Sequence, residues 1–454
     1  MVGVGGAGMS ALATLLVRRG ASVTGTDRSH SAILDALKDA GVRIRARDGA
    51  DPLPADVDLV VASAAVPNDS PELAAARARG VEVIKYADLL GALLSEADGI
   101  CVSGAHGKST TTAWTAFALR TAGLDPTFVI GAHCEQLGGP SGVGAGRHFV
   151  AEACEFDRSF HRLRPRAAVV LNIDREHLDC YRDLDDIQEA FASFVAGLPE
   201  DGLALLNADD PRAAALAERT PARVETFGLV AEANWGVRDL RVERGAQAFS
   251  LSHEGEALGD VRPALPGRHN VYNALATAAL AHYAGAPAEA IRAALETFRG
   301  ARRRLELCGT AGGVTVVDDY AHHPSEVRAT LAAACERYAP RRLWAVFQPH
   351  QYSRTRLLLA EFAAAFAPAH HVLIPDIYAV RDTAEDRRSV SAALLAEVIE
   401  RQGVPATHVP GFEQITQRLL GEVAPGDLVV TMGAGDVWKV AHELAQRLRA
   451  RASR

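Results

Sequence analysis

Residues 103–112 read Ser103-Gly-Ala-His-Gly-Lys-Ser-Thr-Thr-Thr112, and this stretch decides the fold of the chain. The residues before it, 99–102, form a short apolar run that predicts a buried strand, and residues 111–122 have the apolar spacing of a helix. A strand, a glycine-containing loop and a helix in this order direct free backbone N–H groups and the positive end of the helix dipole at one point, where anions bind. The stretch therefore predicts a phosphate-binding loop at the end of a strand.

The polar residues of this loop suit a nucleotide with a bound cation. Lys108 would reach the terminal phosphates, and the Ser109 hydroxyl would ligate Mg²⁺. The usual loop of this kind has four residues between its glycines, whereas this one has two, Ala105 and His106. It is therefore a shortened form, and an ordinary loop before an exposed helix is the alternative.

Length, charge and cysteine content set limits on the class of protein. A chain of 454 residues predicts roughly three domains of ~150 residues each. A formal net charge of −8 argues against a nucleic-acid partner or an anionic membrane surface, although a local arginine cluster could still bind a small anion. The six cysteines include no Cys-x-x-Cys pair, which favours reduced thiols. With no long apolar run or signal-peptide pattern, we expect a soluble cytoplasmic protein without membrane or nucleic-acid partners.

Strand-like and helix-like segments alternate along the whole chain, which predicts an α/β protein with doubly wound, mainly parallel sheets. Residues 224–261 differ, since their pattern predicts a small antiparallel insertion. We expect three α/β domains in series, at residues 1–97, 98–298 and 299–454.

A second glycine pattern lies at the start of the chain. Gly3, Gly5 and Gly8 satisfy G-x-G-x-x-G, and Asp27 lies where an acid that binds a ribose would end the second strand. Only two residues precede Gly3, so the predicted first strand is short. The pattern fits a dinucleotide site, a UDP-sugar site or a tight turn between a strand and a helix.

Two carboxylates and a histidine follow predicted strands of the central segment. Glu152 and Glu155 come directly after an apolar strand, where one of them could complete a Mg²⁺ shell opened by Ser109. His177 lies in the sequence Asn-Ile-Asp-Arg-Glu-His-Leu-Asp at residues 172–179. A lone histidine is more often structural than catalytic, so its role stays open at this point.

Further polar residues gather near two helix starts. Asn270 and Asn273 offer donors and acceptors suited to an adenine edge, while capping of a helix by Asn270 is the alternative. An arginine run at 302–304 is followed by acids and histidines at two strand ends, 317–326 and 347–355. These residues suit phosphate, ribose and carboxylate recognition, or else form a solvated face.

Taken together, the motifs resemble the Mur ligases of bacterial cell-wall synthesis, and the alanine-adding branch in particular. The resemblance covers nearly the whole chain and rests on ordered motifs at residues 3–10, 104–112, 152–160, 172–179, 267–276, 298–305, 318–326, 347–355 and 431–436. It implies a Rossmann-like N-terminal domain that binds a UDP-sugar, a central P-loop ATPase-like domain with a parallel sheet, and a Rossmann-like C-terminal domain. The last would close over ATP and help to bind the amino acid.

The activity implied by the resemblance is that of an ATP-dependent carboxylate–amine ligase. Such an enzyme joins L-alanine to the lactyl carboxylate of UDP-N-acetylmuramate through an acyl phosphate, in peptidoglycan precursor synthesis that supports cell-wall biogenesis, cell shape and cell division. ATP and Mg²⁺ would be its cofactors, and it would be a monomer or a homodimer.

The resemblance also implies a role for each matching residue. The UDP-sugar site would consist of Gly5, Gly8, Met9, Ser10, Asp27 and Ser63. The ATP site would consist of Gly104, Ala105, His106, Gly107, Lys108, Ser109, Thr110, Asn270, Asn273, Arg303 and Asp319. The catalytic residues would be Lys108, Glu152, His177, Arg303, His322 and Arg354. The metal ligands would be Ser109, Glu152 and His177, and the amino-acid site would hold His322, His323 and Arg354.

Some positions depart from the family pattern. Residues 105 and 109 are alanine and serine where threonine is common, and Ser109 keeps the hydroxyl. Cys154 and Phe156 replace polar residues of a frequent Glu-Ala-Asp-Glu-Ser-Asp form, and Gln351 stands where arginine is usual. No lysine lies between residues 177 and 199, as in the alanine-adding branch.

Two other functions are compatible with parts of the pattern. A murein peptide ligase, which joins the same UDP-sugar to a tripeptide, shares most of the motifs. A nicotinamide-dependent oxidoreductase would use the glycines at residues 3–8 and Asp27 but has no use for the loop at residues 104–107.

Overall fold

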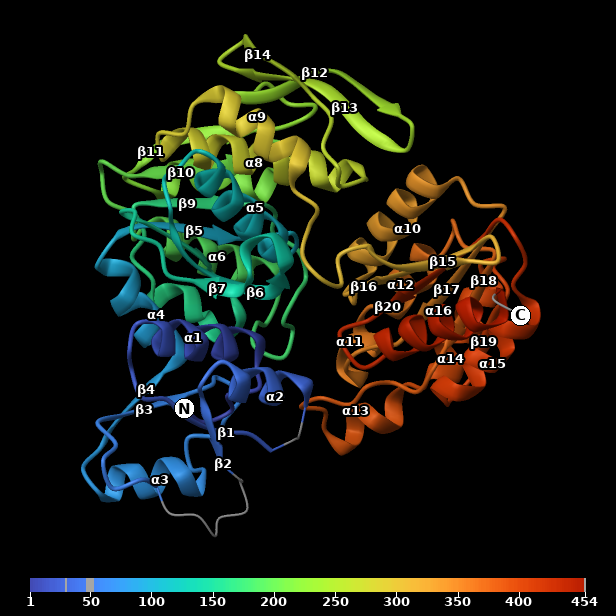
Figure 1. Ribbon diagram of the computed structural model, residues 1–454, viewed down its shortest axis with the longest axis horizontal. Coiled ribbons are helices and arrows are strands. Elements are labelled where there is room, and N and C mark those ends of the chain that lie inside the picture. Colours follow the sequence, from blue (N-terminus) through green and yellow to red (C-terminus); the bar gives the residue numbers. More distant parts are fainter. Residues whose placement is uncertain (29–30, 46–52, 453–454) are drawn as a thin grey trace. The chain divides into compact units, whose positions relative to one another are not determined.

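The computed structural model describes residues 1–28, 31–45 and 53–452 (Figure 1). The chain divides into two compact units, the first formed by residues 1–238, 250–261 and 272–299 and the second by residues 239–249, 262–271 and 300–454. Within the described ranges, no helix combines the length and the apolar character needed to cross a membrane.

The first unit begins with a small parallel sheet built around Val2. Val2 bridges to Thr26 on one side and to Ala62 on the other, so the predicted first strand is reduced to a single bridging residue. The strands of this region are β1 (Thr24–Thr26), β2 (Arg43–Arg45), β3 (Leu59–Ala62) and β4 (Glu82–Lys85). The helices are α1 (Ala7–Arg18), α2 (Ala32–Asp39), α3 (Pro71–Ala78) and α4 (Tyr86–Ser95).

A ten-stranded sheet follows, in the order β14-β13-β12-β11-β10-β9-β5-β8-β6-β7. Its central strands pair in parallel, from β6 through β8, β5, β9 and β10 to β11, and β7 is antiparallel to β6. The strands are β5 (Asp98–Ser103), β6 (Thr127–Cys134), β7 (Gly139–Gly142), β8 (His148–Glu152), β9 (Ala167–Val170), β10 (Leu203–Asn207), β11 (Arg223–Phe227), β12 (Trp235–Glu243), β13 (Ala246–His253) and β14 (Glu256–Val261).

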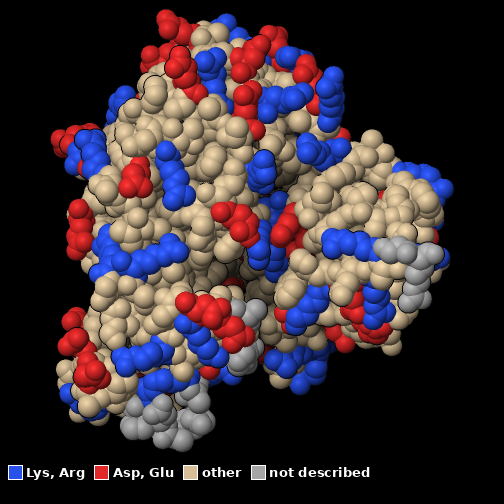
Figure 2. Space-filling model, in the orientation of Figure 1, with Lys and Arg blue, Asp and Glu red and all other residues tan. Residues whose placement is uncertain are grey.

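The last three strands of this sheet form the predicted insertion. β12, β13 and β14 are neighbours joined by two-residue turns, as in successive hairpins, and they lie at the top of Figure 1. Figure 2 shows basic and acidic side chains intermixed over this ribbon. Arg241 and Glu243 of β12 form one such pair, with Nε 2.7 Å from Oε1.

Helices cover the sheet and complete the core of the first unit. They are α5 (Lys108–Thr121), α6 (Leu184–Val195), α7 (Pro211–Ala214), α8 (Arg268–Tyr283) and α9 (Ala288–Thr297), with 3₁₀ segments at Glu135–Leu137, Phe156–Arg162 and Ala215–Arg219. Leucines of α1 and α4 lie in the same apolar cluster as residues of β5, β8 and α6. The N-terminal helices therefore share one core with the ten-stranded sheet.

The second unit is a doubly wound sheet of six strands in the order β15-β16-β20-β17-β18-β19, with β15 antiparallel and the remaining pairs parallel. Its strands are β15 (Glu306–Ala311), β16 (Val314–Asp319), β17 (Arg342–Phe347), β18 (His371–Ile374), β19 (Ala406–His408) and β20 (Asp427–Met432). Its helices are α10 (Pro324–Tyr338), α11 (Tyr352–Leu357), α12 (Leu359–Ala365), α13 (Ala384–Ser389), α14 (Ala392–Arg401), α15 (Phe412–Glu422) and α16 (Trp438–Ala452).

Alternate residues of these strands face two separate cores. Val317 and Leu343 lie in one apolar cluster with residues of α10, α12 and α14, whereas Val316 and Trp344 lie in another with residues of α15 and α16. Because side chains alternate along a strand, both faces of this sheet are covered by helices. The predicted α/β class with mainly parallel sheets is confirmed.

Trp114 of α5 connects this helix to the end of α9. Its ring stacks on Phe298 with centroids 5.3 Å apart, and its Nε1 donates to the Ala294 carbonyl over 3.1 Å. Both rings are fully buried. The contact fixes the helix that follows the loop at residues 104–107.

We expect Trp114→Ala to lower the free energy of unfolding of the first unit by about 3–5 kcal/mol, because it leaves a cavity and an unpaired carbonyl. Urea denaturation followed by circular dichroism measures this loss. Trp438→Ala, at a partly exposed position, is the control. Equal losses of free energy of unfolding in Trp114→Ala and Trp438→Ala would contradict the role of Trp114.

Candidate active site

The loop between β5 and α5 has the geometry of an anion cradle. β5 ends at Ser103, α5 begins at Lys108, and Gly104 and Gly107 have φ of +136° and +86°. A Cβ on Gly107 would lie 2.6 Å from the Asn273 Oδ1, so this position accepts no side chain. The loop passes directly into the helix, whose first N–H groups have no partner within the helix and are available to an anion.

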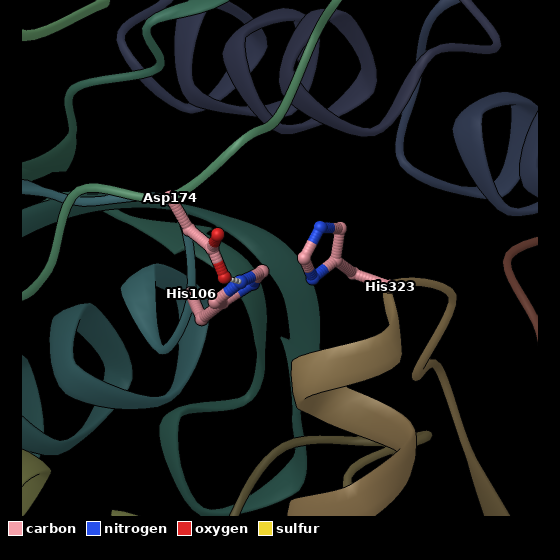
Figure 3. Close-up of side chains that lie close together, drawn as sticks. All are labelled: His106, Asp174 and His323. Carbon is pink, nitrogen blue, oxygen red and sulfur yellow. Dashed lines mark hydrogen bonds and ion pairs between the residues drawn. The ribbon is translucent and has the colours of Figure 1, made fainter. Parts of the chain in front are cut away.

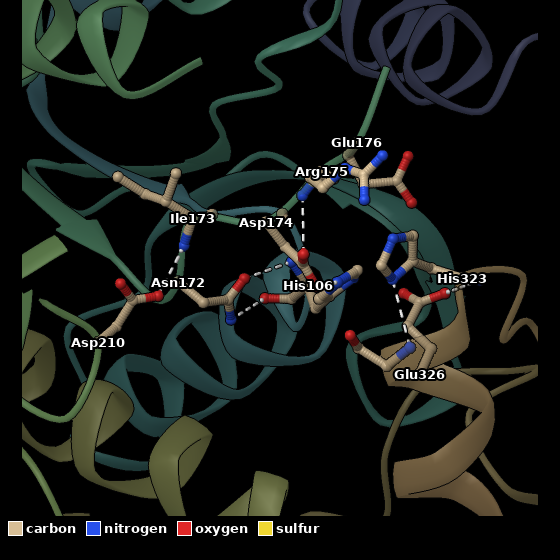
Figure 4. Close-up of polar contacts among 12 residues, drawn as sticks. His106, Asn172, Ile173, Asp174, Arg175, Glu176, Asp210, His323 and Glu326 are labelled. Carbon is tan, nitrogen blue, oxygen red and sulfur yellow. Dashed lines mark hydrogen bonds and ion pairs between the residues drawn. The ribbon is translucent and has the colours of Figure 1, made fainter. Parts of the chain in front are cut away.

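Asn172, in the segment after β9, fastens the loop (Figure 4). Its side-chain oxygen accepts from the His106 N–H over 2.8 Å, and its amide nitrogen donates to the His106 carbonyl over 3.1 Å. The next residue, Ile173, donates its N–H to Asp210 over 2.9 Å. The loop and the end of the neighbouring strand are therefore held as one piece.

His106 and Asp174 meet across this loop, as Figure 3 shows. The His106 Nε2 lies 3.1 Å from the Asp174 Oδ2, and the Asp174 Oδ1 accepts from the Arg175 N–H over 2.7 Å. Neither Asn172 nor Asp174 was predicted from the sequence to have a role in the site. Their position in a polar stretch after a buried strand was the available signal.

Lys108 lies folded over its own loop. Its Nζ donates to the carbonyls of Gly104 and Ala105 over 2.5 and 3.0 Å. It also lies 3.1 and 3.0 Å from the two carboxylate oxygens of Glu155. Burial alone would lower the pKa of Lys108, but the charge of Glu155 outweighs it and holds the pKa above its ordinary value, so the ammonium stays charged.

Glu155 joins Lys108 to His177. The Glu155 side chain is 1% exposed, and its Oε1 lies 3.5 Å from the His177 Nε2. Its backbone carbonyl accepts from the Tyr181 hydroxyl over 2.5 Å. The ring of Phe156 lies against that of His177, with centroids 5.1 Å apart.

Glu152 points to a different partner. Its carboxylate accepts a hydrogen bond from the Gly131 N–H on β6. The structure thus brings Glu155 to Lys108 and His177, while the metal-ligand role that the resemblance implies for Glu152 stays a prediction. From the sequence, both glutamates were candidate cation ligands, and the resemblance implied this role only for Glu152.

The donor set suits a nucleotide with Mg²⁺. Hard divalent cations prefer carboxylate and hydroxyl oxygens, which Glu155 and Ser109 provide. Ser109 lies in the first turn of α5 and is 6% exposed. The glycine cradle, the lysine and these oxygens therefore fit the implied cofactors ATP and Mg²⁺.

At the amino-terminal loop the structure places the predicted residues around the first turn of α1. The Gly5 N–H donates to the Asp27 Oδ2 over 2.8 Å. A Cβ on Gly3 would lie 3.0 Å from that of Ser63, and one on Gly8 would lie 3.0 Å from the Tyr86 ring. Met9 and Ser10 are buried in α1, where the Ser10 hydroxyl donates to a backbone carbonyl.

In the second unit, Arg303 is held by three acceptors. Its Nε donates to the Asp318 Oδ2 over 2.9 Å, and its terminal nitrogens donate to the carbonyls of Gly433 and Gly435 over 2.6 and 3.2 Å. Its guanidinium also lies 5.1 Å from the centre of the Tyr320 ring. These contacts orient the side chain before any ligand binds.

Asp319 fastens the segment that carries Arg303. Its two oxygens accept from the N–H groups of Leu305 and Ala321, each over 2.7 Å. Burial raises the pKa of Asp319 from 3.8 to about 6. In the structure Asp319 therefore accepts from two backbone N–H groups, whereas the resemblance implies that it contacts ribose.

The implied amino-acid site lies at the start of α10 and α11. The His322 Nδ1 lies 3.2 Å from the Glu326 Oε2, and the His323 Nδ1 accepts from the Ser325 N–H over 3.3 Å. The Arg354 Nη1 lies 3.3 Å from the His350 Nδ1.

Two residues near these sites have backbone roles. Gln351, which departs from the family pattern, has φ of +70° and donates its side-chain amide to the Val380 carbonyl over 3.2 Å. Asn270 donates its side-chain amide to the Pro266 carbonyl over 2.7 Å, which holds the chain before α8. Asn273 lies three residues further along the same helix.

Comparison with protein families gives three matches in series. The Mur ligase family, catalytic domain, matches residues 1–97; the Mur ligase middle domain matches residues 102–281; and the Mur ligase, glutamate ligase domain, matches residues 303–435. The three predicted domains in series are confirmed, while their boundaries at residues 97 and 298 stay predictions.

Individual relatives are similar over the full length. The chain is 41% identical over 442 residues to the UDP-N-acetylmuramate–L-alanine ligase of Acetivibrio thermocellus, covering 97% of this chain and 93% of that protein. It resembles the UDP-N-acetylmuramate-alanine ligase MurC of Thermotoga maritima with a TM-score of 0.85, 26% identity and coverage of 99% and 98%. The murein peptide ligase of Psychrobacter arcticus gives a TM-score of 0.73, 26% identity and 98% coverage of both chains.

The raised pKa of Asp319 predicts a pH dependence of stability. Below about pH 4 the carboxyl is protonated in both the folded and the unfolded chain, whereas above about pH 6 the folded protein must hold a buried charge. Stability is therefore lost as the pH rises through this window, by roughly 3 kcal/mol for a two-unit shift. Since Asp319→Asn cannot ionise, its free energy of unfolding minus that of the wild type should increase by that amount between pH 4 and pH 6, in addition to a pH-independent loss from the one backbone N–H that the amide nitrogen cannot accept.

Urea unfolding of both proteins at several pH values between 4 and 7 measures this difference. Asp436→Asn, which removes a carboxylate with 48% side-chain exposure, is the control and should show no such change. A difference between Asp319→Asn and wild type that is constant across the window would refute the assignment.

Proposed function

The chain belongs to the Mur ligase family, and we propose that it is an ATP-dependent ligase that joins L-alanine to the lactyl carboxylate of UDP-N-acetylmuramate. The observation that carries the proposal is the meeting of Lys108, Glu155 and His177 beside the glycine cradle. The names of relatives that align over nearly the whole chain support the choice of substrates.

The reaction needs activation because a carboxylate does not condense with an amine in water. The lactyl carboxylate attacks the γ-phosphorus of ATP, ADP leaves, and an acyl phosphate forms. The neutral amine of L-alanine then adds to the acyl carbon, and the tetrahedral intermediate expels phosphate to give the amide. One ATP is consumed, and the amine proton passes to solvent.

The first unit would hold the reacting phosphates. The N–H groups of residues 107–110, at the start of α5, would bind phosphate oxygens, and Lys108 would leave Glu155 to contact the β- and γ-phosphates. Ser109, Glu155 or Glu152, and His177 would hold Mg²⁺. The ion, when bound, offsets the repulsion between two anions and the charge of the transition state.

The resemblance gives the remaining ligand contacts to residues further along the chain. Arg303, already oriented by Asp318, would contact the transferred phosphoryl group, and His322, His323 and Arg354 would bind the amino acid. Asn270 and Asn273 would contact adenine. Asp319 would bind ribose in addition to the two backbone N–H groups that it accepts.

The amino-terminal loop would bind the UDP part of the sugar nucleotide through Gly5, Gly8, Met9, Ser10, Asp27 and Ser63. The link between Gly5 and Asp27 supports this by holding the loop and the end of β1 together. A cytoplasmic location is part of the proposal, and the six cysteines, which form no disulfide, support it.

Phosphate release from ATP and Mg²⁺ in the presence of UDP-N-acetylmuramate tests the function. We expect release that requires the sugar nucleotide and is fastest with L-alanine, when L-alanine, glycine, L-serine and the murein tripeptide are supplied in turn. Release with the tripeptide and none with L-alanine would assign a murein peptide ligase instead. Release without the sugar nucleotide would overturn both assignments.

Lys108→Ala should reduce turnover by at least about 10³-fold, because the transferring phosphates lose their positive partner. Binding of UDP-N-acetylmuramate, measured by calorimetry, should change less than about threefold and shows that the variant is folded. Lys439→Ala, a half-exposed lysine paired with Asp436, is the matched control. If Lys108→Ala turns over within tenfold of the wild-type rate, Lys108 does not have the proposed catalytic role.

A further inference from the structure

Cys154 lies beside the two residues that contact each other in the candidate active site. The Cys154 Sγ, a Glu155 carboxylate oxygen and a His177 ring nitrogen all lie within 4.8 Å of one another. Of these, the Glu155 Oε1 and the His177 Nε2 are 3.5 Å apart. Three different donor groups thus converge on one point, and all three belong to the first unit.

The spacing of these atoms fits a small tetrahedral ion. Zn²⁺ binds sulfur at ~2.3 Å and nitrogen or oxygen at ~2.0–2.2 Å, so ligand atoms in a tetrahedral site lie roughly 3.3–3.8 Å apart. A set of three protein ligands leaves the fourth position to water. The Glu155 and His177 atoms already have this spacing at 3.5 Å, and the two pairs that include the Cys154 Sγ, at no more than 4.8 Å, can reach it by side-chain rotation.

Neighbouring contacts hold the segments that carry the three donors. Cys154 accepts a backbone hydrogen bond from Phe160 over 3.0 Å, and the Glu155 carbonyl accepts from the Tyr181 hydroxyl. Phe156 lies against the His177 ring. The backbone of Cys154 and Glu155 and the ring of His177 are therefore held by contacts that do not involve an ion.

We propose that Cys154, Glu155 and His177 form a binding site for a thiophilic divalent cation of the Zn²⁺ type. Binding releases the Cys154 thiol proton to solvent, and a water molecule completes the shell. Mg²⁺ prefers oxygen ligands and has little affinity for a thiolate, so the sulfur biases this site towards softer ions.

Lys108 is the competitor of such an ion. Its ammonium group lies 3.0 Å from the Glu155 Oε2 and repels a cation at the same carboxylate. The carbonyls of Gly104 and Ala105 remain as partners for Lys108 when the ion takes Glu155. The inference rests on the proposed function only for its consequence: a soft ion that holds Glu155 and His177 withholds these residues from Mg²⁺ and so inhibits ligation.

Co²⁺ is the probe for this site, because thiolate coordination gives a charge-transfer absorption and tetrahedral geometry gives intense visible bands. The full chain, freed of metal and without nucleotide or sugar, is titrated with Co²⁺. We expect one equivalent to produce both signals, and Zn²⁺ to abolish them.

Three variants locate the ligands. Cys154→Ser should lose the charge-transfer band, and His177→Gln should bind Co²⁺ at least about tenfold more weakly. Cys180→Ser, which removes an exposed thiol three residues after His177, should keep both signals. Circular dichroism of each variant confirms its fold, and the His177→Gln titration decides the matter if Cys154→Ser does not fold.

The proposal is overturned if the wild type shows no charge-transfer band, if the band persists in Cys154→Ser, or if it is lost in Cys180→Ser. The proposal is also overturned if His177→Gln binds Co²⁺ as tightly as the wild type does. Because no substrate is present in these titrations, their result does not depend on whether the ligase assignment is correct. Conversely, loss of the metal signals would leave the ligase assignment standing.

Discussion

The ion pair between Lys108 and Glu155 is the constraint on which the candidate site depends. The two side chains are 14% and 1% exposed, so each charge is removed from water and needs the other. Leaving one buried charge without its partner typically costs about 3–5 kcal/mol. The pair therefore requires that the loop after β5 and the segment after β8 come together. The parallel pairing of these strands, with adjacent carboxyl ends, provides that arrangement.

The cradle itself could be predicted because its signals are local. A buried strand, two glycines and a lysine at a helix start lie within the eleven residues 98–108, and the structure has them in that order. The fastening of the loop by Asn172 could not be predicted, because it depends on β9 being the neighbour of β5. Strand order comes from the packing of the whole sheet rather than from any short stretch.

The sequence also does not show which of Glu152 and Glu155 contacts Lys108, although the two residues are only three positions apart. Both residues follow β8 and both are plausible cation ligands, so spacing alone does not separate them. The backbone changes direction after Glu155, where Asp157 and Arg158 have φ of +54° and +51°.

In the second unit, Arg303 was predicted from the sequence as a site residue, but two of its hydrogen-bond acceptors are the carbonyls of Gly433 and Gly435, about 130 residues further along the chain.

The Lys108–Glu155 pair also couples the ligands of this site to one another. When a phosphate group draws the Lys108 ammonium away, Glu155 is left as a buried anion, and its affinity for a divalent cation rises. When a cation binds Glu155 first, Lys108 loses its carboxylate partner and becomes available to a phosphate. Because such coupling is reciprocal, each ligand strengthens the other by the same factor. Binding of a phosphate group and of the Mg²⁺ that accompanies it would thus be cooperative as a direct result of one buried ion pair.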